Sequence, residues 1–96
     1  MMNGETRIIN GAWSEEDNAW VSETLCLTGV CRLEADLPDK GRLVIKKSES
    51  ENGPFPKAYI SRWGGTSFII NIYGTTRERY IRIYLTETPT SIKLVS

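Results

Sequence analysis

Short runs of β-forming residues, separated at close intervals by turn-forming residues, are the feature that most limits the folds open to this chain. Gly, Pro, Asn and Asp punctuate the sequence, and the runs between them are rich in Val, Ile, Thr and Tyr, which favour strands. This spacing predicts an all-β, antiparallel fold of about eight short strands. The expected strands are residues 6–9, 20–27, 30–37, 42–47, 57–63, 67–73, 79–86 and 92–95.

Eight short strands are enough for two packed sheets, so we predict a two-sheet β-sandwich, immunoglobulin-like or jelly-roll-like in its general plan. The chain has 96 residues, the size of one domain, and we assign residues 1–96 to a single sandwich domain. At most one helical turn is expected, at residues 14–17, where Ser14 is placed to cap and Asp17 to reciprocate. Trp20 is expected in the core.

Alternation of apolar and polar residues indicates the faces of the first strand pair. It is clearest in residues 31–37, whose inward side chains are expected to be Cys31, Leu33, Ala35 and Leu37. The next four residues, Pro38-Asp39-Lys40-Gly41, are typical of a tight turn, because Pro presets φ and Gly adopts the left-handed region freely. We therefore expect a hairpin in which residues 42–47 return beside residues 30–37.

The stretch 68–85, FIINIYGTTRERYIRIYL, alternates in the same way on both sides of a Gly-Thr-Thr turn. The side chains expected in the core are Phe68, Ile70, Ile72, Ile81, Ile83 and Leu85. A hairpin would then place the remaining side chains together on an outer face. The expected cross-strand partners are Tyr73 with Tyr80, Asn71 with Arg82, and Ile69 with Tyr84.

Two further aromatic residues join this outer face in only one register of the preceding strand. A two-residue Gly64-Gly65 turn puts Tyr59 and Trp63 on the core side, whereas a three-residue turn puts Tyr59 opposite Asn71 and leaves Trp63 outside. Gly-Gly favours the first register and the alignment of apolar residues favours the second, so both stay open. The candidate binding residues are Tyr59, Trp63, Asn71, Tyr73, Tyr80, Arg82 and Tyr84.

Cys26 and Cys31 flank another expected turn, and the turn length decides their chemistry. A two-residue turn would place the two cysteines opposite each other, close enough for a disulfide. A three-residue loop over residues 28–30 instead buries Leu25 and Leu27, which stabilises the fold by roughly 2 to 5 kcal/mol. We favour the loop, with Cys31 as a reduced core thiol and Cys26 facing outward. Cysteines this close in sequence are not the inter-sheet pair of an immunoglobulin domain.

Catalytic signatures are missing from the sequence. Histidine is absent, which removes the commonest general base, the commonest metal ligand and the usual partner of a Ser or Cys nucleophile. The closest carboxylate pairs, Glu15 with Asp17 and Glu34 with Asp36, are expected at exposed positions where their pKa values stay ordinary. Two cysteines alone do not complete a zinc site. We therefore expect no enzymatic activity, no metal site and no cofactor.

Charge gives little guidance to the partner, because twelve basic residues balance twelve acidic ones. The distribution is uneven, since residues 1–51 hold six basic and ten acidic residues and residues 52–96 hold six and two, net −4 and +4. No apolar run approaches the roughly 20 residues of a membrane-spanning helix. The N-terminus lacks a signal-peptide pattern, which leaves the localisation open, including that of a secreted or cell-surface module.

Tyr, Trp and Arg on a sheet face are the residue types that dominate protein interfaces. We therefore expect a non-catalytic module that makes protein–protein contacts, self-association included, through this aromatic face. The first alternative is a carbohydrate-binding module that uses the same face, and the second is a single-stranded nucleic-acid binder resembling an oligonucleotide-binding barrel. A purely structural role also stays open, because cross-strand Tyr pairs stabilise a sheet by themselves.

Overall fold

The computed structural model describes residues 5–27, 29–75 and 77–96, and within them all eight strands belong to one antiparallel sheet. The strands are β1 (Thr6–Ile8), β2 (Gly11–Ser14), β3 (Ala19–Ser22), β4 (Leu25–Cys26), β5 (Val30–Ser48), β6 (Lys57–Tyr73), β7 (Tyr80–Leu85) and β8 (Ser91–Val95). The described residues include no helix. The prediction of an all-β, antiparallel fold is therefore confirmed.

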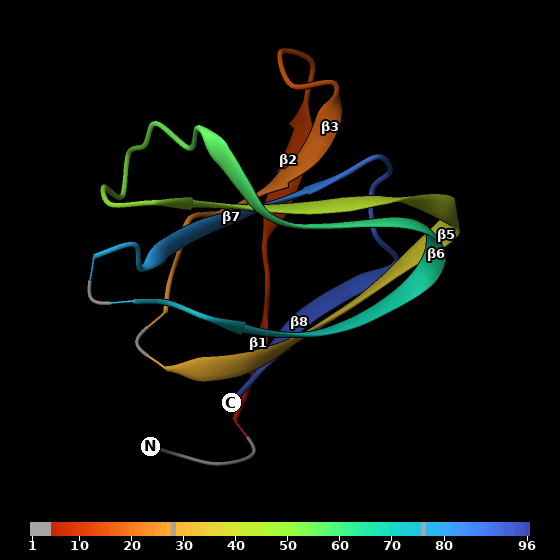
Figure 1. The fold of residues 1–96 in the computed structure, drawn as a ribbon. Helices are drawn as coiled ribbons and strands as arrows, with labels where there is room; N and C mark the ends of the chain where they lie inside the picture. The colour runs from red at the N-terminus through yellow and green to blue at the C-terminus, as the bar shows by residue number, and fades with distance from the viewer. Residues whose placement is uncertain (1–4, 28, 76) are drawn as a thin grey trace.

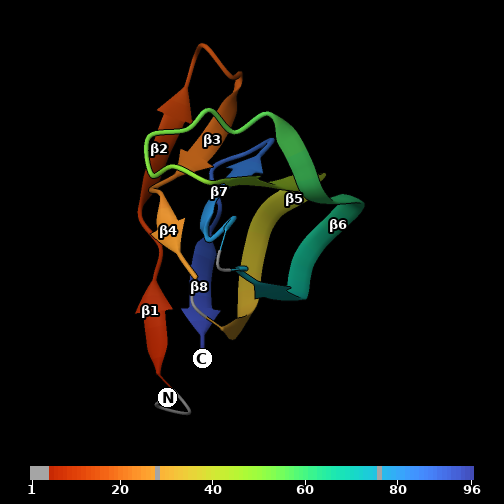
Figure 2. The ribbon, with the colours of Figure 1, turned by 60° about the vertical axis from the view of Figure 1, so that its left-hand side comes forward.

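Two long strands, β5 and β6, run side by side and bend together, which folds the sheet into a half-barrel (Figures 1 and 2). In the first half of β5, residues 30–36 pair with β6 and residues 32–36 also pair with β8; in the second half, residues 42–47 pair with β6 and residues 43–48 pair with β7. We call the part with β1 and β8 the lower layer and the part with β2, β3 and β7 the upper layer, as they lie in Figure 1. The predicted two-sheet sandwich is not confirmed.

The bend lies where Gly41 of β5 faces Gly65 of β6. On one side of it the pairing is regular up to Asp36 with Ser67; beyond it the pairing resumes with a shifted register. Residues 37–40 of β5 thus lie opposite a single residue of β6, and such an excess on one strand bends a ladder sharply. Gly64 has a φ of +72°, in the left-handed region that favours glycine.

The two hairpins predicted at this place are wrong. Residues 38–41 and Gly64-Gly65 have the composition of tight turns, but each lies inside a continuous strand at its corner. Neither register proposed for the Gly64-Gly65 turn therefore applies. The physical reason is that β5 and β6 bend as a pair, so each strand keeps its neighbour around the corner and neither doubles back on itself.

The predicted hairpin over residues 68–85 is also wrong, because β6 and β7 both flank β5 and do not pair with each other. Tyr73 faces Val30, and Tyr80 faces Ser48. The predicted turn includes Thr76, which lies outside the described residues. Alternation determines which face a side chain occupies but not which strand lies beside it, and the chain here crosses from the lower layer to the upper layer.

The predicted faces, in contrast, are confirmed. Trp20 and the six apolar residues of the 68–85 stretch are buried, as are the apolar residues expected at positions 33, 35 and 37. Leu25 and Leu27 are buried too, although Leu25 faces Ile81 of β7 and the expected hairpin with residues 30–37 is wrong. Thr28 of that expected loop lies outside the described residues.

The two cysteines are free thiols with different surroundings. Cys31 packs against the core, and burial raises its pKa, whereas Cys26 is exposed. These positions agree with a core-facing Cys31 and an outward Cys26.

The capping pattern at Ser14 forms a hydrogen-bonded turn and no helix. The amide of Asp17 donates to Ser14 Oγ at 3.1 Å, and that hydroxyl donates to the Asp17 carboxylate at 2.8 Å. The turn joins β2 to β3, and β2 is not among the strands expected from the sequence pattern. In this pair Trp13 faces Trp20, and the Trp20 ring occupies the space where Gly11 lacks a side chain.

Asp36 ties three strands together just before the bend. Its carboxylate accepts hydrogen bonds from Ser67 Oγ of β6 and from Ser91 Oγ of β8, both at 2.8 Å. Its carbonyl oxygen accepts from the amide of Thr90 at 2.8 Å. The hydrogen bond from Ser67, followed by that from Ser91, lowers the pKa of the Asp36 carboxyl group.

The first prediction concerns the corner. Gly64→Ala should lower the free energy of unfolding by about 1 to 2 kcal/mol, the cost of a left-handed residue that carries a Cβ. No atom lies within 4 Å of the added Cβ, so the cost comes from the backbone alone. Gly29→Ala is the matched control, because its surroundings are equally open and its φ lies outside the left-handed region. Urea unfolding measures the free energy of unfolding of both variants, and equal values would contradict a left-handed conformation at Gly64.

The second prediction concerns pH. The pKa of Asp36 is lower in the folded chain than its unfolded value of about 3.9, so the stabilisation is present above that value and lost as pH falls through the folded-state pKa. The free energy of unfolding of the wild type should therefore fall more steeply below about pH 4 than that of Asp36→Asn. Asp39→Asn is the matched control, because it removes an exposed carboxylate and leaves Asp36 with its hydrogen bonds, so the steep fall should remain. Parallel curves for the wild type and Asp36→Asn would refute this role.

Candidate functional site

The structure distributes the seven candidate residues over three places. Four lie on the outward side of the upper layer: Trp63, Tyr80, Arg82 and Tyr84. Tyr59 and Tyr73 contact each other across the open side of the half-barrel. Asn71 is exposed on the lower layer, where it faces Arg32. The seven residues therefore do not form the expected single patch, but four of them share the outward side of the upper layer.

The outward side of the upper layer is built by alternation in three adjacent strands. Ile83 and Leu85 of β7 face inward, so their neighbours Arg82 and Tyr84 face outward. Arg82 lies beside Lys46 of β5, and Tyr84 lies beside Val44. On the other side of β5, Arg42 faces Trp63 of β6. We call this surface the basic–aromatic face, and its residues are Arg42, Val44, Lys46, Phe55, Ser61, Trp63, Tyr80, Arg82 and Tyr84.

Each of three cations on this face lies over an aromatic ring. The Arg42 guanidinium is 4.8 Å from the Trp63 ring centroid, and the Lys46 ammonium is 4.7 Å from that of Tyr84. The Arg82 guanidinium is 4.4 Å from the ring of Phe55, which comes from the loop before β6. All three distances lie within the roughly 6 Å at which a ring attracts a cation.

Hydrogen bonds fix the orientation of both arginines. Arg82 Nε donates to Thr24 Oγ1 at 2.9 Å, and Arg42 Nε donates to Ser61 Oγ at 3.3 Å. Each guanidinium group is thus held by a ring and a hydroxyl group, and its terminal nitrogens keep donors for another partner.

None of these three cations forms an ion pair with a residue that the structure describes. The ion pairs within the described residues join Arg7 to Glu23, Arg32 to Glu34, Arg77 to Glu49 and Lys93 to Glu34. Two of them lie on the outward side of the lower layer, where Glu34 serves both Arg32 and Lys93. Both of these lower-layer cations therefore have a carboxylate partner, and the three cations of the basic–aromatic face have none among the described residues.

A shallow groove of about 350 Å³ runs beside the basic–aromatic face. Its charged lining consists of Arg42 and Lys46 from β5 and Asp17 from the turn between β2 and β3. Asp17 is engaged by Ser14, and its carboxylate makes no ion pair within the described residues. Positive charge therefore prevails in the groove.

Tyr59 and Tyr73 link the two layers on the open side of the half-barrel. Their ring centroids are 5.9 Å apart and their planes stand at 83°, which is the favoured edge-to-face arrangement. The Lys47 ammonium is 3.7 Å from the Tyr59 centroid and 4.9 Å from that of Tyr73. Burial raises the pKa of Tyr59, and the adjacent Tyr73 raises it further. We call these three residues the aromatic clamp.

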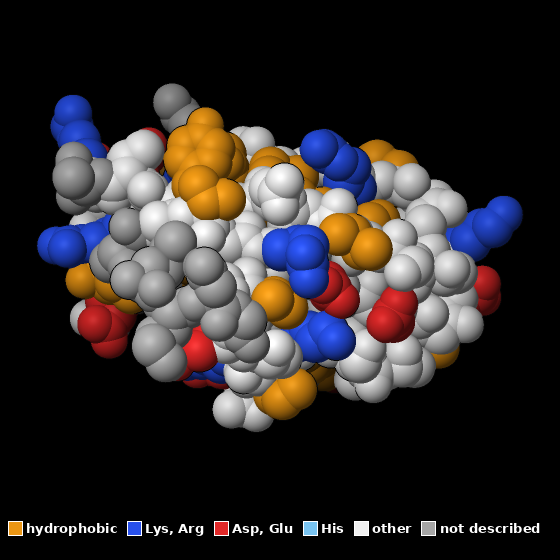
Figure 3. Space-filling model, turned by 90° about the horizontal axis from the view of Figure 1, so that it is seen from below, with side chains coloured by type: hydrophobic (Ala, Val, Ile, Leu, Met, Phe, Trp, Pro, Cys, Tyr) orange, Lys and Arg blue, Asp and Glu red, His pale blue; other side chains and the backbone are white. Residues whose placement is uncertain are grey.

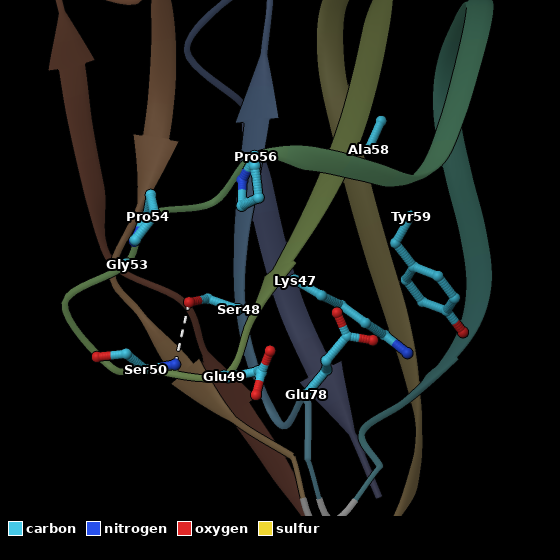
Figure 4. A pocket seen from close by; sticks show the side chains of 10 residues that line it. All are labelled: Lys47, Ser48, Glu49, Ser50, Gly53, Pro54, Pro56, Ala58, Tyr59 and Glu78. Atoms are coloured by element: carbon cyan, nitrogen blue, oxygen red, sulfur yellow. Dashed lines mark hydrogen bonds between the residues drawn. The ribbon is translucent and has the colours of Figure 1, made fainter.

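A second groove, of about 520 Å³, opens beside the aromatic clamp (Figure 4). Lys47 and Tyr59 point toward each other across it, and Glu78 approaches from the segment before β7. Glu49 and the segment around Pro54 form its other side. The described residues contain no group of three or more His, Cys, Asp or Glu side chains able to hold a metal ion.

The outward side of the lower layer has a mixed character. Figure 3 shows hydrophobic side chains separated by charged side chains of both signs. Ile69 is 69% exposed and faces Glu34, and Asn71 lies two pairs farther along the strand. This surface lacks the single charge sign of the basic–aromatic face.

Five members of the basic–aromatic face were absent from the sequence-based set: Arg42, Val44, Lys46, Phe55 and Ser61. The alternation of Arg42, Val44 and Lys46 with Leu43 and Ile45 carries enough information to place the two cations outward. Phe55 lies in a loop between two prolines, where no periodicity indicates a direction.

Comparison with protein-family models, curated proteins and solved structures finds no match to this chain. Within the described residues, no helix is long and apolar enough to span a bilayer.

The third prediction tests the aromatic clamp with a double-mutant cycle. Tyr59→Leu and Tyr73→Leu should show a coupling energy of about 0.5 to 1.5 kcal/mol, the usual value for an edge-to-face pair. Tyr80→Leu and Tyr84→Leu form the control cycle, because these residues share a strand face without a ring contact. Their effects should add within about 0.5 kcal/mol. Additive effects of Tyr59 and Tyr73 would show that the ring contact contributes nothing.

Proposed function

We propose that this protein is a non-catalytic binding module that contacts an acidic segment of a partner protein through the basic–aromatic face. The observation that carries the proposal is the presence of Arg42, Lys46 and Arg82 on one sheet face without an ion-pair partner among the described residues. Arginine and aromatic residues contribute most of the binding energy in protein interfaces. The lower layer covers the apolar side of this face, as the second layer of a sandwich does.

The arrangement of the cations favours binding because much of their freedom is already lost. Thr24 and Phe55 hold Arg82, and Ser61 and Trp63 hold Arg42. Ordering a long side chain at an interface costs about 0.5 to 1.5 kcal/mol, and a side chain that is ordered beforehand avoids most of that cost. A partner carboxylate supplies the missing counter-charge through charge-assisted hydrogen bonds.

An acidic protein segment fits this face better than a nucleic acid or a sugar does. Bases and sugars stack on open ring faces, but Lys46 covers one face of Tyr84 and Arg82 covers one face of Phe55. The whole chain has a net charge of zero, which gives little long-range attraction to a nucleic-acid backbone. The face therefore offers a partner its cations and the edges of its aromatic rings, a combination that suits an acidic peptide.

The fourth prediction uses a fluorescent peptide of Glu, Asp and Leu as the probe. The wild type should bind it, and the double variant Lys46→Glu/Arg82→Glu should bind more than about tenfold more weakly, because two charge-assisted contacts become repulsive. Lys40→Glu/Arg62→Glu is the matched control, since it makes the same charge change at exposed positions away from the face. Circular dichroism verifies that all variants are folded.

Two results would overturn the proposal. One is equal loss of peptide binding in the face variant and the control variant, which would indicate unspecific electrostatics. The other is tighter binding of an oligothymidine or an anionic oligosaccharide than of the peptide at the same ionic strength, which would assign the face to another class of ligand.

A further inference from the structure

The second edge of β6 plays no part in the function proposed for the basic–aromatic face. β6 pairs with β5 along one edge, and no other described strand pairs with it (Figure 2). From Ser67 to Tyr73 the ladder with β5 runs without a register shift. A regular strand of this kind presents evenly spaced N–H and C=O groups along its free edge.

This part of the edge lacks the features that keep natural edge strands from pairing. Residues 65–73 contain no Lys, Arg, Asp, Glu or Pro. The register shifts of the β5–β6 pair all lie between Asp36 and Lys46, on the other side of Ser67. Charges, prolines and bulges are the usual protection of an edge strand. Ile69, at the centre of the segment, is 69% exposed.

We propose that the free edge of residues 67–71 pairs with the same edge of a second copy of this chain, antiparallel and centred on Ile69. The pairing forms a closed dimer, because a two-fold axis midway between the two opposed Ile69 residues relates each strand to the other. It also keeps outward side chains on the outward side, since directly opposed residues of an antiparallel pair share a face.

The segment is complementary to itself in this register. On the outward side the opposed residues are Ile69 with Ile69 and Ser67 with Asn71. On the inward side they are Phe68 and Ile70. No pair opposes like charges, and Ser67 and Asn71 are able to share a hydrogen bond. Phe68 and Ile70 join the cores of the two copies.

A second copy fits this edge better than the acidic segment assigned to the basic–aromatic face. An acidic strand would place carboxylates opposite Ile69 and beside Glu34, which faces Ile69 from β5. The edge residues belong to the lower layer, and the basic–aromatic face lies on the upper layer. The inference therefore goes beyond the proposed function, and either one can fail without the other.

The experiment, which is the fifth prediction, is sedimentation velocity of the wild type and two charged variants from micromolar to nearly millimolar concentration. The wild type should pass from monomer to dimer over this range, because one added strand pair is a small interface. Ile69→Lys and Ile69→Glu, each alone, should dissociate at least about tenfold more readily, since the axis opposes two like charges. An equimolar mixture of the two variants should regain the dimer, because the axis then opposes Lys and Glu.

Val30→Lys is the matched control. Val30 is also an exposed apolar residue, 61% accessible, but it lies on β5, one strand away from the edge. This variant should dimerise like the wild type, and circular dichroism verifies the fold of every variant. A wild type that stays monomeric throughout, a dimer that survives Ile69→Lys, or a mixture that fails to recover overturns the inference. If Val30→Lys loses the dimer as much as the Ile69 variants do, general apolar association and not edge pairing holds the two copies together.

Discussion

The facing glycines at the corner of β5 and β6 allow the two strands to bend together, and the remaining structure depends on that bend. A Cβ on Gly41 would meet the Thr86 side chain and lie 2.9 Å from Leu37, and a Cβ on Gly65 would lie 3.0 Å from the Phe68 ring. Side chains therefore occupy the space that these glycines leave. Without the bend, the apolar faces of β5 and β6 would stay in one flat layer with nothing to cover them.

The bend also explains why the surfaces differ. It sends residues 42–46 of β5 to the upper layer with their cations unpaired, and residues 32–36 to the lower layer, where Glu34 pairs with Arg32 and Lys93. The charge asymmetry along the sequence does not explain this difference, because Arg42 and Lys46 come from the acidic half of the chain. The basic–aromatic face is positively charged, whereas the free edge of β6 in the lower layer is uncharged. The two surfaces suit different partners.

Aromatic residues serve two purposes in this molecule. Tyr59 and Tyr73 are fourteen positions apart in one strand, yet their rings touch because the strand turns back at the corner. They hold the open side of the half-barrel together with Lys47. Trp63 and Tyr84 instead face outward and hold cations in position. The same residue type is structural or available for binding according to the layer that it occupies.

The sequence by itself determined which side chains are buried. The two-residue period of residues 33–37, 68–72 and 81–85 correctly placed every second residue in the core and Ile69 outside it, because a strand allows only two directions for a side chain. It also placed Arg82 and Tyr84 on the outward side. These are local properties, and neighbouring residues are enough to define them.

The tertiary structure alone decided which strands are neighbours. Pro38 to Gly41 and Gly64-Gly65 have the composition of hairpin turns, but they form the corner of a strand pair, and the same composition serves both uses. Pairing depends on hydrogen bonds between residues far apart in the chain, such as those that place β6 and β7 on opposite sides of β5. The grouping of Arg42, Lys46 and Arg82 beside Trp63, Phe55 and Tyr84 therefore exists only in the folded sheet.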